Sequence, residues 1–198
     1  MAWYPEPKPV PDTLDTADLQ LEMLAPEHVD IDHDAFMSSR ERLLAWSGGR
    51  WPHEGFTRDE NMADMVMHRD EFLAREAFAY TVLNRSHDRC EGCIYIDPLG
   101  RPGDLDPSGA TADFPESTAR VTWWVRDDAL ERDLDRQLVN ALVDWFQTDW
   151  DFDAVTFLNS RRQRPRHRPA GGCRPQLPRR EVTGSERGPG SSWLAWVD

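Results

Sequence analysis

One stretch, residues 120–146, passes from a strand pattern to a helix pattern within a few residues. Residues 121–125, V-T-W-W-V, are all β-branched or aromatic, which is typical of a strand on a half-buried surface. Apolar residues then recur at spacings of three and four and predict one amphipathic helix along Leu130, Leu134, Leu138, Ala141, Leu142 and Trp145. Asp128, followed by Glu131, predicts a cap at the start of this helix. A strand that leads straight into a helix N-terminus is a candidate anion site, because free N–H groups and the helix dipole point toward it.

The sequence around this stretch predicts further strands and helices in a regular order. A strand over residues 19–24 precedes two helices, the second of which begins with the capping pair Thr57 and Glu60. Met62 and Met65 of this second helix are expected to pack in the core. An antiparallel hairpin comes next, and a strand follows the long helix. The predicted boundaries are 30–46 and 57–76 for the two helices, 77–83 and 92–96 for the hairpin, and 154–158 for the last strand.

This order of elements, with the hairpin at Gly92, the strand end Trp124-Val125-Arg126 and Asn159 after the last strand, resembles the GNAT superfamily of acetyl-CoA-dependent N-acetyltransferases. The resemblance covers about residues 19–160. It implies an α/β (α+β) fold in which helices flank a mixed, mostly antiparallel central sheet, with an irregular C-terminal part. It also implies an acyltransferase domain over residues 18–160, which would transfer an acetyl or acyl group from acyl-CoA to a substrate amine.

The resemblance further implies which residues hold acetyl-CoA. In the family, the fourth and fifth strands splay apart around the thioester arm, which would place backbone groups of Trp124 and Val125 beside it. Arg126 and Arg132 are the predicted phosphate contacts, together with the amides at the helix start, and Arg136 is the only other cation expected near them. The catalytic acid and base stay unassigned.

The phosphate-binding pattern of the family, R/Q-x-x-G-x-G/A, falls on residues 130–135, and its chemistry differs here. Leu130 stands in place of Arg or Gln, and Asp133 and Asp135 stand in place of the two glycines. At roughly 5 Å and an effective dielectric near 20, each carboxylate would repel a phosphate charge by about 3 kcal/mol. Two hypotheses therefore remain open: an N-acyltransferase, with or without impaired CoA binding, and a non-catalytic GNAT-fold binding or interaction protein that no longer binds CoA.

Other residues with reactive side chains give weaker signals. His53 and Glu54 lie in the loop between the first two helices, which faces the acceptor substrate in the family. Glu91 could act as a base if burial raised its pKa. Cys90 and Cys93 form a C-x-x-C, but the sequence offers no second pair and no nearby His to complete a zinc site. We therefore predict structural cysteines and no metal.

Three segments lack a folded pattern. Residues 1–17 are Pro-rich and predict a mobile extension, and residues 99–118 predict a mobile Gly/Pro/Asp loop. Residues 161–198 form an Arg/Pro-rich, irregular tail with a predicted terminal strand over 192–197. Read one base out of frame, codons permitted for Pro165 to Arg180 can encode the helix that the family pattern expects, so we hypothesise a frameshift near Asn159. The alternatives are an Arg-rich arm that binds nucleic acid and an arm that folds back on the acidic body.

The charge and composition limit the partners. The formal net charge of the chain is −13, whereas residues 161–198 hold nine Arg against three acidic residues. An acidic body does not favour nucleic acid, and no apolar segment approaches the length of a membrane span. We expect a small-molecule or peptide amine as substrate and a reduced, cytoplasmic location, and the oligomeric state is left open.

Overall fold

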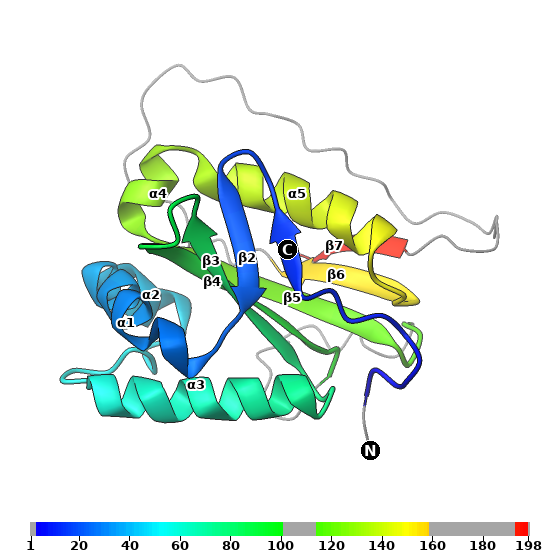
Figure 1. The fold of residues 1–198 in the computed structure, drawn as a ribbon, viewed down its shortest axis with the longest axis horizontal. Helices are drawn as coiled ribbons and strands as arrows, with labels where there is room; N and C mark the ends of the chain where they lie inside the picture. The colour runs from blue at the N-terminus through cyan, green and yellow to red at the C-terminus, as the bar shows by residue number, and fades with distance from the viewer. Residues whose placement is uncertain (1–2, 101–113, 159–192, 198) are drawn as a thin grey trace.

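The computed structural model describes residues 3–100 and 114–158 and the backbone of 193–197 (Figure 1). The sequence interpretations of 101–113 and 159–192, including the frameshift and the Arg-rich arm, lie outside these residues. A seven-stranded sheet runs in the order β1-β2-β3-β4-β5-β6-β7. The strands are β1 Thr13–Asp15, β2 Leu19–Met23, β3 Phe78–Asn84, β4 Cys90–Pro98, β5 Thr118–Val125, β6 Ala154–Leu158 and β7 Trp193–Val197.

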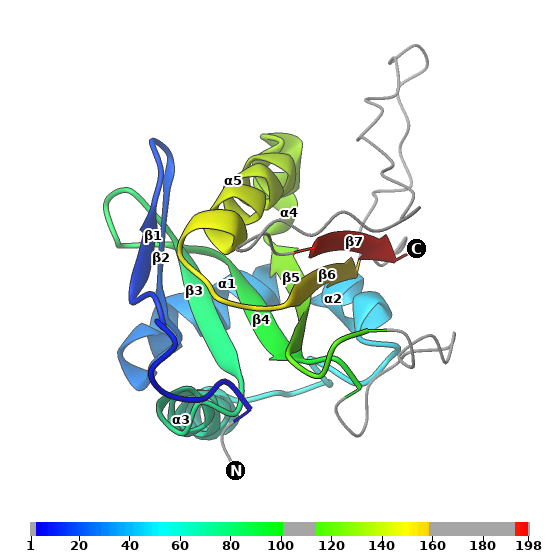
Figure 2. The ribbon, with the colours of Figure 1, turned by 90° about the vertical axis from the view of Figure 1, so that its right-hand side faces the viewer.

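The sheet is mixed and mostly antiparallel, which confirms the predicted fold class. Neighbours from β1 to β5 are antiparallel, and β5, β6 and β7 are parallel to one another. One face is covered by α1 Val29–Ser38, α2 Arg40–Trp46 and α3 Arg58–Leu73, and the other by α4 Asp127–Glu131 and α5 Leu134–Thr148 (Figure 2). None of the helices in the described ranges is both long and apolar enough to cross a membrane.

The alternation of side chains along β5 connects the two layers of core. Successive residues of a strand point to opposite faces. Trp123 therefore packs in the cluster under α5, and Trp124 packs in the cluster under α1 and α3. Both indoles are almost fully buried, with 4% and 0% of their surface exposed. Packing on both faces of the sheet therefore holds β5 in place, which suits a strand with a candidate site at its end.

The first predicted helix is two helices. The chain breaks at Ser39, whose side chain is buried and whose hydroxyl accepts a hydrogen bond from the Asp127 N–H at 3.0 Å. The break therefore docks α1 and α2 onto the junction of β5 and α4. In α3, the predicted capping box of Thr57 and Glu60 is confirmed, and Met65 is buried in the core. This helix ends at Leu73, three residues before the predicted end.

The prediction of a mobile N-terminal extension is wrong for much of residues 3–17. Tyr4 is fully buried, its hydroxyl accepts from the Asp151 N–H at 2.8 Å, and its carbonyl accepts from Arg75 Nε at 2.7 Å. Thr13–Asp15 adds a strand to the edge of β2. The sequence is Pro-rich and polar, so composition alone indicates disorder. The aromatic surface that receives Tyr4, including Phe78 and Trp150, comes from distant parts of the chain.

Candidate functional site

Among residues 3–100, 114–158 and 193–197, the carboxyl end of β5 pairs with another strand on one side only. The ladder between β5 and β6 runs from Thr118 paired with Ala154 to Val121 paired with Phe157. β5 continues for four more residues, Thr122–Val125, which pair with β4. Ligands of open α/β sheets bind beyond the carboxyl ends of the strands, where neighbouring strands diverge. The end of β5 is therefore the best placed part of this sheet for a ligand.

The segment after β5 does not form the single helix that the apolar stripe predicts. α4 and α5 are separated at Arg132 and Asp133, and Asp133 has a left-handed backbone with φ of 58°. Glycine adopts that conformation at least cost. Asp133 therefore stands where the family pattern has a glycine, and its backbone also has the conformation that glycine adopts most readily. The Asp133 side chain makes no capping hydrogen bond at the start of α5, so within the described part of the chain the N–H groups of this first turn are candidate donors for an anion.

The predicted cap at Asp128 is wrong. Arg126 is the residue before α4 and its own side chain forms no cap, whereas the Ser39 hydroxyl accepts from the Asp127 N–H at this helix start. The Asp128 carboxylate instead accepts a hydrogen bond from Arg89 and lies 3.5 Å from Arg126 Nε. A charged pair outcompetes a neutral amide for this carboxylate, because hydrogen bonds between ions are stronger. The pairing lowers the pKa of Asp128, although partial burial acts in the opposite direction and is the larger single influence.

Both predicted phosphate contacts lie near the open end of β5, and both already have carboxylate partners. Arg126 Nη1 is 2.7 Å from Asp34 Oδ2, and Arg132 Nη2 is 2.8 Å from Glu91 Oε2. Glu91 is only 3% exposed, so it depends on Arg132 for much of its charge balance. A diphosphate bound here would have to compete with these carboxylates.

The expectation that only Arg136 accompanies these two cations is wrong. Arg89 pairs with Asp128, and Arg42 of α2 reaches across to donate to the Val125 carbonyl and to the Asp127 carboxylate. Arg42 Nη1 is buried and has no hydrogen-bond partner among the residues that the structure describes. The sequence carries no local signal for this contact, because the break at Ser39 decides where α2 lies.

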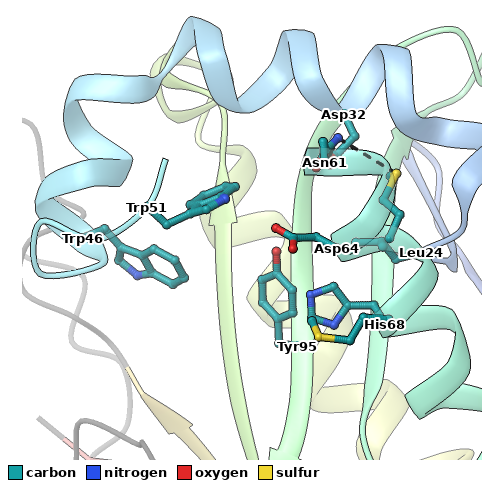
Figure 3. Close-up of a pocket in the computed structure, with 10 residues that line it drawn as sticks. Leu24, Asp32, Trp46, Trp51, Asn61, Asp64, His68 and Tyr95 are labelled. Atoms are coloured by element: carbon teal, nitrogen blue, oxygen red, sulfur yellow. Dashed lines mark hydrogen bonds between the residues drawn. The ribbon is translucent and has the colours of Figure 1, made fainter. Parts of the chain in front are cut away.

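A pocket of about 230 Å³ lies on the other side of β5, between the α1–α2 segment, α3 and β4 (Figure 3). Its lining combines aromatic rings, two carboxylates and a histidine. The lining residues are Leu24, Asp32, Trp46, Trp51, Asn61, Asp64, Met65, Met67, His68 and Tyr95. Trp124 links the pocket to the end of β5, because its Nε1 donates to the Tyr95 hydroxyl at 3.3 Å.

Asp64, Tyr95 and His68 give this pocket its acid–base character. Figure 3 shows the Asp64 side chain and the Tyr95 hydroxyl pointing toward one another, with the His68 ring beside them. Partial burial raises the pKa of Asp64 above its ordinary value, and burial of the Tyr95 hydroxyl raises the pKa of this side chain well above its ordinary value. His68 Nδ1 lies 3.5 Å from Glu71 on the same helix. The pocket can therefore hold an amine against a carboxylate and aromatic faces.

The acid–base candidates taken from the sequence lie elsewhere. His53 is exposed and pairs with Glu60 at 3.3 Å, and neither His53 nor Glu54 lines the pocket. Glu91 is buried, as its proposed role required, but it is held in ion pairs with Arg89 and Arg132. Asp64 and His68 were not singled out, although their spacing of four places both on one face of α3. The methionine stripe of α3 predicts only the side of the helix that faces the core.

Comparison with solved structures finds proteins that resemble this chain in fold. The structure resembles the ribosomal-protein-S5-alanine acetyltransferase of Vibrio fischeri with a TM-score of 0.51 and 16% identity, over 68% of this chain and 66% of that one. A GNAT-family acetyltransferase of Bordetella pertussis matches with a TM-score of 0.47 and 17% identity, over 70% and 73% of the two chains. RimL, the ribosomal L7/L12 acetyltransferase, in complex with coenzyme A, matches with a TM-score of 0.47 and 13% identity, over 68% and 67%. No family model and no curated protein matches the sequence.

The chain therefore has the fold of the GNAT acetyltransferases. The similarity to the V. fischeri enzyme extends over slightly less than two thirds of that protein. At this level of identity it establishes the fold, and the residues of the site carry the argument about chemistry.

Proposed function

We propose that this chain binds an acyl-CoA at the open end of β5 and transfers the acyl group to an amine held in the Asp64 pocket. One observation carries the proposal. The last residues of β5 extend beyond the β6 ladder on one side, and Trp124, in the same segment, contacts Tyr95 of the pocket on the other. A thioester beside the strand end and an amine in the pocket would meet at Trp124.

The chain's own groups support a direct transfer. The amine nitrogen would attack the thioester carbonyl carbon, the carbon–sulfur bond would break, and CoA would leave as a thiolate that takes a proton from water. The proton lost by the amine would pass to the Asp64 carboxylate. A carboxylate with a raised pKa is a better base at neutral pH than an exposed one, which suits Asp64 to this role. The acceptor is a small-molecule or peptide amine.

Acyl-CoA fits the site in part. The free amides at the start of α5, the Arg42 donor and the open edge of β5 would suit the phosphates and the thioester arm. Arg126 and Arg132 would contribute only after giving up carboxylate partners, and Asp133 adds a negative charge. We therefore expect acyl-CoA to bind with weaker affinity than a glycine-containing loop would provide.

The test uses the purified full-length chain and acetyl-CoA. Binding is measured by calorimetry, and transfer is measured as CoA released in the presence of an alanine-leading peptide, a lysine-bearing peptide or a linear diamine. Binding with amine-dependent CoA release is the expected result. Binding without release from any amine would favour a non-catalytic binding protein, and the absence of binding would refute the proposed site.

Substitution of Asp133 tests the phosphate end of the site. Asp133→Gly should raise CoA affinity about tenfold, because one carboxylate at about 5 Å from a doubly charged diphosphate in a water-like dielectric costs about 1.5 kcal/mol. Asp133→Asn should give a similar gain, since it removes the charge and tolerates the left-handed backbone. Asp144→Asn, on the exposed face of α5, is the matched control and should change nothing. Equal affinities in all variants would mean that the Asp133 carboxylate faces away from the phosphates.

A further inference from the structure

Three buried side chains from two elements converge on one point beneath the pocket. They are Asp32 of α1 and Cys90 and Cys93 of β4, and their ligand atoms all lie within 4.8 Å of one another. Cys93 Sγ is 3.2 Å from Asp32 Oδ1, and Cys90 Sγ is 3.7 Å from the same oxygen. Both cysteines are free thiols with no exposed surface.

A bulge in β4 brings the two cysteines to the same face. Residues three apart in a regular strand point to opposite faces. Here Val82 pairs with Gly92 and Leu83 pairs with Cys90, so Glu91 is an extra residue in the strand. Cys90 and Cys93 consequently both lie in the core cluster under α1. A bulge cannot be read from the spacing of the two cysteines, so the sequence alone does not show that their side chains share a face.

The distances suit a tetrahedral metal centre. Zinc binds sulfur at about 2.3 Å and carboxylate oxygen at about 2.0 Å, so a tetrahedral angle sets the distance between sulfur and oxygen ligands at about 3.5 Å. The two distances of 3.2 and 3.7 Å lie on either side of this value. Each sulfur–oxygen distance would need to change by only a few tenths of an ångström, and thiolate with carboxylate is a donor set that zinc accepts.

The surroundings of Asp32 favour a bound metal ion over an ion pair with a basic side chain. No Lys or Arg pairs with Asp32 among the residues that the structure describes, and its carboxylate receives Asn61 Nδ2 at 3.0 Å in addition to the two thiols. Asp32 and Asn61 also line the pocket, so the carboxylate side of the cluster borders the pocket while the two thiols lie behind it. Independently of acyl transfer, we propose that Asp32, Cys90 and Cys93 bind a thiophilic divalent cation of the zinc type, with a fourth position left for water or a small ligand.

Cobalt is the probe for this site, because thiolate ligands give it a charge-transfer absorption. The reduced full-length chain should take up about one equivalent of Co²⁺ with this absorption and should release about two protons as the thiols ionise. Zn²⁺ should displace the cobalt. Cys90→Ser and Cys93→Ser should each abolish the absorption, and Asp32→Asn should weaken Co²⁺ binding at least tenfold.

Cys173→Ser is the matched control, because it removes the remaining cysteine of the chain and should leave the absorption intact. Circular dichroism establishes that each variant is folded. Absence of the absorption in the fully reduced wild-type chain would overturn the proposal, and so would its persistence in Cys90→Ser. The proton release of the wild-type chain requires no variant, so the proposal can fail even if a substitution prevents folding.

Discussion

Replacing Asp64 by Asn should lower kcat by about a hundredfold or more and leave acetyl-CoA affinity unchanged. A positioned general base contributes roughly 10²–10⁴ to a proton-transfer step, and an amide of the same shape cannot accept the proton. Asp64 lies in the acceptor pocket, and its charged neighbours are His68 and Glu60 of the same helix, so the cofactor half of the site at the end of β5 should remain intact. The measurement is CoA release at saturating acetyl-CoA and amine, with calorimetry for binding.

Asp59→Asn provides the comparison for this variant. Asp59 is an exposed carboxylate in the first turn of α3 and does not line the pocket. Its substitution should leave kcat unchanged, although both variants remove one negative charge from the same helix. An equal loss of kcat in Asp59→Asn would mean that the removal of a negative charge from α3 lowers the rate, and that Asp64 does not act as a base. Full activity in Asp64→Asn would assign the proton to another group, with His68 the nearest candidate on α3.

The pH dependence of kcat gives a second readout of Asp64. Because burial raises the pKa of Asp64, its carboxylate should become protonated, and inactive as a base, at a higher pH than an ordinary aspartate. Protonation of the amine also lowers the rate on the acid side. The informative quantity is therefore the difference between the wild-type and Asp64→Asn profiles. That difference should be full at higher pH and should vanish as the pH falls through the raised pKa of Asp64.

Local patterns predicted the framework of the fold well. The capping box at Thr57, the hairpin of β3 and β4 and the strand β6 each depend on residues that are near one another in sequence. Caps, turns and alternation are short-range rules, so one sequence is enough to apply them. The same rules missed the end of α4, because the apolar stripe continues through Arg132 while Asp133 adopts a backbone that its sequence does not announce.

Of the candidate site, the sequence predicted only the part at the end of β5. Trp124 and Val125 lie at the open end of β5 as the family resemblance implied, and whether they contact acyl-CoA stays a prediction. The pocket and the Asp32 cluster depend on contacts between α1, α3 and β4 that no local pattern encodes. A glycine does give a clue to the close approach of β4 and β5, since Gly92 lies opposite the end of β5.

Gly92→Ala should destabilise the chain by about 3 kcal/mol, because overpacking against rigid neighbours costs roughly that much. A Cβ at Gly92 would lie 2.1 Å from the Trp124 carbonyl oxygen and 2.8 Å from Val125 Cα. Both are backbone atoms, so no side-chain rotation can relieve the clash, and β4 and β5 must separate where the site is formed. We expect the melting temperature to fall by about 10 °C, at roughly 2–4 °C per kcal/mol for a chain of this size.

Gly55→Ala is the control that separates a clash from a loss of backbone freedom. Gly55 has a φ of 74° and no neighbouring atom within 4 Å of an added Cβ, so only the left-handed backbone opposes alanine there, at a cost of about 1 kcal/mol. Gly92→Ala should therefore lose about three times as much stability, measured by denaturant unfolding. It should also bind acetyl-CoA more weakly below its melting temperature, whereas Gly55→Ala should not. Equal effects of the two substitutions would mean that β4 and β5 separate at Gly92 at little energetic cost. The end of β5 would then not be held rigidly enough to position a thioester.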